Sequence, residues 1–124
     1  MLKSALLCLA LTVYHEARGE PEQGMYAVAE VVVNRAKEQD KNICEIVQER
    51  NQFSWVRRWD GKIPKEKPGW TKSVFIAHTT LDTGGHNLTN GATYFHSKRV
   101  KRPNWKAVYA ITIGNHVFYR SLKS

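Results

Sequence analysis

Two glutamates four residues apart, Glu16 and Glu20, are the side chains of this 124-residue sequence best placed for acid–base chemistry. They lie in the stretch VYHEARGEPEQG, where an apolar segment ends and Pro21 opens the next one. A carboxylate in the last turn of a helix faces the negative end of the helix dipole, and apolar neighbours bury it, so its pKa rises. A raised pKa keeps a proton available to a general acid near neutral pH. Arg18 lowers the pKa if its guanidinium lies close, and the sequence leaves open which effect prevails.

Other catalytic chemistries have little support in the sequence. There is no glycine-rich phosphate loop, and the five histidines are scattered without an HExxH motif. We therefore expect neither a metal nor a cofactor. Cys8 and Cys44 each lie among apolar residues and are too few for a disulfide framework, so we interpret them as two buried thiols.

The elements that position the two glutamates follow from periodicity and from capping residues. We predict helices over about 4–18, 21–38, 39–49 and 71–82, a long loop over 50–70, and strands over about 91–97, 106–113 and 116–121. Ser4 is the expected N-cap of the first helix, and Gly19 is its expected C-cap glycine. Gly114–Asn115 is a typical two-residue hairpin turn. Helices followed by a small antiparallel sheet predict an α+β fold, and the length predicts one domain over residues 1–124.

The apolar N-terminal run SALLCLALTV resembles a signal peptide. No small-residue cleavage site separates it from the glutamate motif, and it is shorter than the ~20 residues that span a membrane. We interpret it as a core helix, and we expect neither an export signal nor membrane insertion.

Charge and aromatic content narrow the class of partner. The formal net charge is +8 and the isoelectric point is about 9.7, which favours a polyanionic partner such as nucleic acid, anionic membrane or bacterial cell wall. Tryptophans occur in polar stretches such as FSWVRRWDG and RPNWK, which we interpret as binding surface rather than core. Such aromatics suit sugar rings, and they equally suit stacked bases of single-stranded nucleic acid. A nucleic-acid-binding module is therefore an alternative to an enzyme.

Longer motifs resemble a known family. The stretch VYHEARGEPEQGMYAVAEVVVNRAKE, followed in order by ICEIVQERNQFSWV, GATYFHS, PNWK and IGNHVFY, is similar to the SleB-type cell wall hydrolases, which include spore-cortex-lytic enzymes and related phage and bacterial proteins. The resemblance covers about residues 5–120. It implies a lysozyme-like α+β domain that cleaves peptidoglycan between N-acetylmuramic acid (MurNAc) and N-acetylglucosamine (GlcNAc). It also implies that Glu16 is the catalytic acid of a lytic transglycosylase.

The number of carboxylates needed depends on the reaction. A hydrolytic muramidase uses two, about 5–5.5 Å apart when it retains configuration and about 6.5–9.5 Å apart when it inverts. A transglycosylase needs one, which acts as acid and then as base. We expect Glu16 to take that role, with Glu20 and Arg18 as catalytic support and Glu20 ordering Arg18, Arg35 or the loop that follows. A hydrolytic muramidase remains the alternative.

The same motifs suggest residues that contact the substrate, whereas His15 receives no role. The residues expected to bind glycan are Asn34, Arg35, Phe53, Ser54, Trp55, Tyr94, Phe95, His96, His116 and Phe118.

A bare basic catalytic domain without an export signal fits a phage endolysin that waits in the host cytoplasm and then attacks the wall. We expect a monomer that binds peptidoglycan glycan strands and no specific nucleic acid.

Overall fold

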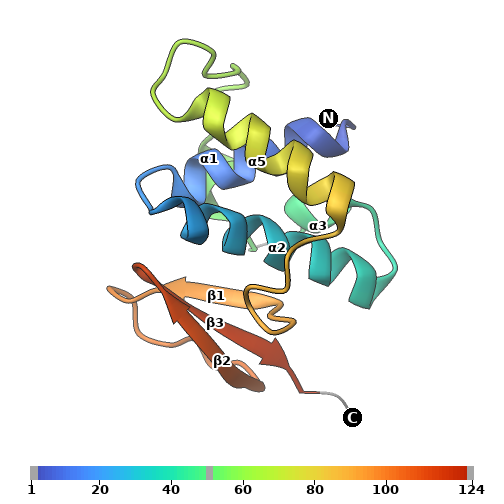
Figure 1. The fold of residues 1–124 in the computed structure, drawn as a ribbon, viewed down its shortest axis with the longest axis vertical. Coiled ribbons are helices and arrows are strands. Elements are labelled where there is room, and N and C mark those ends of the chain that lie inside the picture. The colour runs from blue at the N-terminus through green and yellow to red at the C-terminus, as the bar shows by residue number, and fades with distance from the viewer. Residues whose placement is uncertain (1–2, 50–51, 123–124) are drawn as a thin grey trace.

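The computed structural model describes residues 3–49 and 52–122 as a helical layer lying over a small sheet (Figure 1). The helices are α1 (Ala5–Ala17), α2 (Glu22–Gln39), α3 (Ile43–Val47), α4 (Ser54–Arg58) and α5 (Trp70–Thr83). The strands are β1 (Tyr94–Ser97), β2 (Ala107–Ile113) and β3 (His116–Ser121). This arrangement confirms the predicted α+β class.

Helix α1 is the centre of the helical layer. It contacts α2, α3, α4 and α5, and every residue from Cys8 to Tyr14 is buried. Burial on all sides explains why this helix is apolar around its whole circumference and resembles a signal peptide. Ser4 caps it as predicted, because its hydroxyl accepts a hydrogen bond from the Leu7 N–H. Within the described residues, no helix is both long and apolar enough to cross a membrane.

The turn after α1 differs from the prediction. Arg18 is the C-cap residue and stays in the right-handed helical region. Gly19 does not adopt a positive φ, so it is not the left-handed cap that was expected. Pro21 precedes α2, and its carbonyl accepts hydrogen bonds from the N–H groups of Gly24 and Met25. The two helices are therefore joined by a turn of only a few residues, which fixes their relative direction.

The segment predicted as one long loop over 50–70 contains the short helix α4. Trp55 in this helix and Trp70 at the start of α5 are both buried, so interpreting the tryptophans as binding surface was wrong for these two. Each has polar neighbours in sequence that point outward, while its own indole packs into the core.

The cysteines form a disulfide, which overturns the prediction of two free thiols. Cys8 of α1 and Cys44 of α3 have Cα atoms 5.4 Å apart, within the range that a disulfide bridges, and they close a loop with a sequence separation of 36. The prediction failed because the bond depends on tertiary packing. Helix α3 packs against α1 and brings together two cysteines whose neighbours in sequence are apolar. The bond ties the central helix to the segment that follows α2.

The sheet has the strand order β1-β3-β2, with both pairings antiparallel. Gly114 and Asn115 form the predicted hairpin turn between β2 and β3, and Gly114 has a positive φ of 58°. Phe95 of β1 pairs in register with Phe118 of β3, which is fully buried. Strand β1 lies nearest to α2 in Figure 1, so this edge of the sheet borders the helical layer.

Replacing both cysteines, as in the Cys8→Ala/Cys44→Ala variant, should lower the free energy of unfolding by roughly 3–4 kcal/mol, because the loop is then open in the unfolded chain. Urea unfolding of the oxidised wild type and of the variant measures this difference. Reductant should lower the stability of the wild type and leave that of the variant unchanged. Two titratable thiols in the denatured, unreduced wild type would contradict the bond.

Candidate active site

A cleft of about 1250 Å³ separates the helical layer from the sheet. Its helical wall comes from the end of α1, from α2, from the segment after α3 and from α4, and its other wall comes from β1, the β1–β2 loop and the start of β3. The helical wall contributes His15, Glu16, Gly19, Glu20, Val31, Arg35, Gln48, Glu49, Gln52, Phe53, Ser54, Val56 and Arg57. The other wall contributes Thr93, Tyr94, Phe95, His96, Ser97, Arg99, Val100, Pro103, Trp105, Asn115 and His116.

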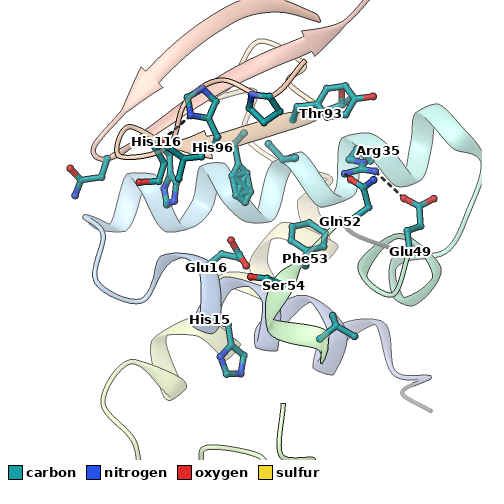
Figure 2. Close-up of a pocket in the computed structure, with 18 of the residues that line it drawn as sticks. His15, Glu16, Arg35, Glu49, Gln52, Phe53, Ser54, Thr93, His96 and His116 are labelled. Atoms are coloured by element: carbon teal, nitrogen blue, oxygen red, sulfur yellow. Dashed lines mark hydrogen bonds and ion pairs between the residues drawn. The ribbon is translucent and has the colours of Figure 1, made fainter. Parts of the chain in front are cut away.

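Glu16 points into this cleft from the last turn of α1. Figure 2 shows its carboxylate directed toward the sheet, with Ser54 beside it. Burial raises the pKa of Glu16. Within the described residues, no hydrogen-bond donor or cation is paired with the carboxylate, so nothing offsets the loss of water around its charged form. Glu16 therefore has the environment of a general acid.

Arg18 does not act on Glu16. Its guanidinium donates a hydrogen bond to the Tyr14 carbonyl at 3.1 Å and lies 4.6 Å from the centre of the Tyr14 ring. It does not line the cleft. Of the two opposing effects that the sequence left open, burial prevails, because Arg18 is turned toward the body of α1.

Glu20 is held by the β2–β3 hairpin. The Asn115 backbone N–H donates to its Oε1 at 2.8 Å, and the Asn115 side-chain amide donates to its Oε2 at 3.0 Å. Burial alone would raise the pKa of Glu20, but the two Asn115 donors and the nearby His116 and Lys98 outweigh it and lower that pKa. The expectation that Glu20 orders Arg18, Arg35 or the following loop was wrong, because its partner lies 95 residues away.

Gly114 makes this contact possible. A Cβ at this position would lie 2.5 Å from the Glu20 Oε1, closer than side-chain carbons approach, and the positive φ independently favours glycine. His116 follows in the same hairpin, with its Nδ1 3.7 Å from the Glu20 Oε1. Burial lowers the pKa of His116, while the charge of Glu20 partly offsets this effect. The turn after α1 is thus attached to the sheet across the cleft.

Arg35, which is buried, holds a partly exposed polar cluster at another part of the cleft lining. Its guanidinium donates to the Gln52 Oε1 at 2.7 Å and to the Glu49 Oε1 at 2.9 Å, as the dashed lines of Figure 2 show in part. It also lies 5.4 Å from the centre of the Tyr94 ring. Glu49 has a second cation, Lys41, at 3.1 Å. Arg35 therefore connects α2 to the segment after α3 and to the sheet.

Phenylalanines form the apolar wall beside Glu16. Phe95 lies between Phe53 and Phe118, with ring centres at 6.2 and 5.9 Å. The His116 ring meets Phe95 edge-on at 5.2 Å. Phe53 and Phe95 thus give one side of the cleft an apolar surface, and Phe118 lies behind Phe95 in the core.

Most of the residues predicted as catalytic, supporting or glycan-binding lie in the cleft lining. They are Glu16, Glu20, Arg35, Phe53, Ser54, Tyr94, Phe95, His96 and His116. Four others do not line it: Arg18 contacts Tyr14, Asn34 donates its side-chain amide to the Ala92 carbonyl, Trp55 is buried against His15, and Phe118 is in the core. The structure therefore does not favour direct contact between these four side chains and the glycan.

Several cleft residues were not identified from the sequence. His15 stacks on Trp55 with ring centres 4.9 Å apart, and both burial and the charge of Arg18 lower its pKa. Arg57 and Arg99 also line the cleft, and the only signal that could have pointed to Arg99 was the dense positive charge around the PNWK motif. Trp105, which the sequence placed on a binding surface through the stretch RPNWK, does line the cleft.

Cofactor binding has no preformed ligand set in the described part of the chain. Across residues 3–49 and 52–122, no cluster of three or more His, Cys, Asp or Glu side chains is placed to hold a metal ion. The expectation of a cofactor-free enzyme stays a prediction.

The opposite pKa shifts of Glu16 and Glu20 predict opposite effects on stability. The folded pKa of Glu16 lies above that of the unfolded chain, about 4.3, so its contribution to stability is lost as pH rises through the folded value. Glu16→Gln should therefore gain stability relative to the wild type between acidic and neutral pH.

The pKa of Glu20 is lowered, so its contribution is present above about pH 4.3 and is lost as pH falls. Glu20→Gln should be less stable than the wild type at neutral pH, with the difference shrinking in acid. Thermal unfolding of the three proteins across this pH range measures both trends. Shifts of the same sign in the two variants would contradict the assignment.

Comparisons with known proteins agree with this geometry. A family profile described as Cell Wall Hydrolase matches residues 19–119, beginning just after Glu16. The chain is also similar to the catalytic domain of the germination-specific lytic transglycosylase SleB from Bacillus anthracis, with 26% identity, a TM-score of 0.74 and 97% of each chain covered. A second similar structure is the catalytic domain of the Bacillus cereus SleB protein, with 28% identity, a TM-score of 0.71, and 94% of this chain and 89% of that chain covered. No curated protein sequence matches.

The two structural matches extend over almost the whole chain, and they confirm the lysozyme-like α+β fold. The profile covers most of the sequence and confirms the resemblance seen in its motifs. The protein is therefore an enzyme of the cell wall hydrolase family.

Proposed function

We propose that the protein cleaves the MurNAc–GlcNAc bond of peptidoglycan as a lytic transglycosylase. The observation that carries this proposal is the difference between the carboxylates of the cleft. Glu20 is hydrogen-bonded through both oxygens, and Glu49 is paired with two cations, whereas Glu16 is half-buried and has a raised pKa. One carboxyl group is thus free for proton transfer, which is the number that a transglycosylase needs. The similarity to the B. anthracis lytic transglycosylase supports the same reaction.

In the proposed reaction Glu16 first donates its proton to the glycosidic oxygen, and the bond to the MurNAc C1 breaks. The resulting Glu16 carboxylate then accepts the proton of the muramic C6 hydroxyl while the C6 oxygen bonds to C1. A 1,6-anhydro ring forms, no water is consumed, and Glu16 regains its proton. The phenylalanine wall supports this outcome, because excluding water disfavours the competing hydrolysis.

Digestion of purified sacculi should release muropeptides that carry 1,6-anhydromuramic acid, detected by mass spectrometry. Glu16→Gln should lose at least ~10²-fold in rate, the lower range for a general acid, while staying folded. Glu20→Gln should keep measurable activity. Activity should fall on the alkaline side as Glu16 loses its proton, since its pKa lies above the usual value. Reducing-end products without the anhydro ring would establish a hydrolytic muramidase instead.

We also propose that the enzyme reaches the wall from the host cytoplasm, as a phage endolysin does. The net charge of +8 suits the polyanionic wall, and the Cys8–Cys44 bond suits an oxidising site of action beyond the cytoplasm. The enzyme should act there as a monomer.

Expression inside a bacterial host should leave the culture turbid until the inner membrane is permeabilised, after which turbidity should fall. The Glu16→Gln variant is the control, because it should leave the culture turbid in both conditions. Lysis of intact cells by the wild type without permeabilisation would show that the chain crosses the membrane unaided and would contradict the proposed route.

A further inference from the structure

The loop between β1 and β2 is the most positively charged segment of the molecule. Residues 98–106, KRVKRPNWK, contain the cations Lys98, Arg99, Lys101, Arg102 and Lys106 and no acidic residue. Arg99, Val100, Pro103 and Trp105 of this loop line the same cleft as Glu16. The charge is therefore inside the candidate active site as well as around it.

The loop is held in a fixed position by its own aromatic and cationic side chains. Trp105 stacks on Tyr94 with ring centres 5.0 Å apart and meets Tyr119 edge-on at 5.6 Å. Arg102 donates to the Ala107 carbonyl at 2.6 Å and lies 4.6 Å from the centre of the Tyr119 ring. The loop therefore presents its remaining cations from a defined place at the edge of the sheet.

Two cleft arginines have no partner within the described part of the chain. Arg57 on α4 and Arg99 in the loop are both exposed, and neither makes a hydrogen bond or ion pair there through its side chain. Arg35, by contrast, is fully engaged with Glu49 and Gln52. With Glu20 and Glu49 also engaged, the charge left for a ligand on the two walls of the cleft is positive.

We infer that Arg57 and Arg99 bind carboxylates of the peptide stems attached to the glycan strand. This inference rests on the proposed function. In a strand that carries stems, the lactyl carboxyl of each muramic acid is consumed in the amide bond to the stem, so the sugar backbone is uncharged. The anionic groups are then the carboxylates of the peptide, and the guanidinium fork suits them because it can form two parallel hydrogen bonds. The enzyme thus contacts the glycan through Glu16 and binds the stems through Arg57 and Arg99.

Kinetics on two forms of soluble, uncrosslinked glycan strand test the assignment. One form keeps its stems, and the other has lost them to an amidase, which leaves the lactyl carboxylate. On stem-bearing strands, Arg57→Gln and Arg99→Gln should each raise KM on the order of tenfold with little change in kcat, as expected for losing a charged hydrogen bond in binding. On stripped strands each variant should have the KM of the wild type.

Arg58→Gln and Arg120→Gln are matched controls. Both arginines are exposed and lie outside the cleft lining, and Arg58 is adjacent to Arg57 on the same helix. These two control variants remove one positive charge each, as Arg57→Gln and Arg99→Gln do, and they should keep the wild-type KM on both forms of the strand. If all four variants raise KM alike, the effect is one of net charge, and the assignment to Arg57 and Arg99 is overturned.

Two further outcomes would also overturn the inference. Equal losses on both strands would show that the two arginines act on the sugar backbone that both strands share, and wild-type KM values throughout would show that they are merely solvated. Binding of stem-bearing strands to Glu16→Gln, followed by tryptophan fluorescence, separates this inference from the proposed reaction. If the wild type cuts no strand, but adding Arg99→Gln to the Glu16→Gln variant still weakens strand binding, the proposed reaction is wrong and the stem site stands. If strands are neither cut nor bound, both fail.

Discussion

The burial of α1 is the constraint on which the rest of the structure depends. Helices pack around it on several sides, and the disulfide fixes its first half to α3. A helix held in this way cannot move its last turn independently, and that turn carries Glu16. The carboxyl group lies where the core ends and the cleft begins, so the packing that stabilises the fold also removes water from the acid. The raised pKa of Glu16 is a direct consequence of where α1 ends.

Glu20, in the turn that follows α1, attaches the helical layer to the sheet. Four residues after Glu16, Glu20 receives both of its hydrogen bonds from Asn115 and fastens the hairpin to the helical layer. The two carboxyl groups occupy opposite environments, one poor in donors and the other rich in them. Pairs of titratable groups separated in this way mark a division of roles. Here Glu20 fastens the hairpin to the helical layer, and Glu16 is the carboxyl group to which we assign the proton transfer.

Local features of the sequence were enough to predict much of this arrangement. The Ser4 cap, the apolar faces of α1 and α2, and the Gly114–Asn115 turn depend on neighbouring residues, and the structure confirms them. Glu16 was recognised as a cleft acid because both its helix-end position and its family motif are local.

What the sequence did not predict depends on distant partners. The Cys8–Cys44 bond and the Glu20–Asn115 contact each require knowing which elements pack together, and no periodicity contains that information. The burial of Trp55 was missed for the same reason, because the stretch around it contains Ser54, Arg57 and Arg58, while its neighbours in space include His15 and Trp59. The polar cluster around Arg35 also joins three segments.

The charges of the cleft are arranged so that substrate binding and proton transfer do not interfere. A guanidinium within a few ångströms of Glu16 would stabilise its ionised form and lower its pKa. No such effect acts on Glu16, whose pKa responds to burial alone, although two arginines that are unpaired within residues 3–49 and 52–122 line the same cleft. Arg57 and Arg99 are exposed to water, which screens their charge, whereas the acid lies where water is scarce. Under the proposed function, cations at the exposed parts of the cleft can therefore attract an anionic substrate while the Glu16 carboxyl group still keeps its proton.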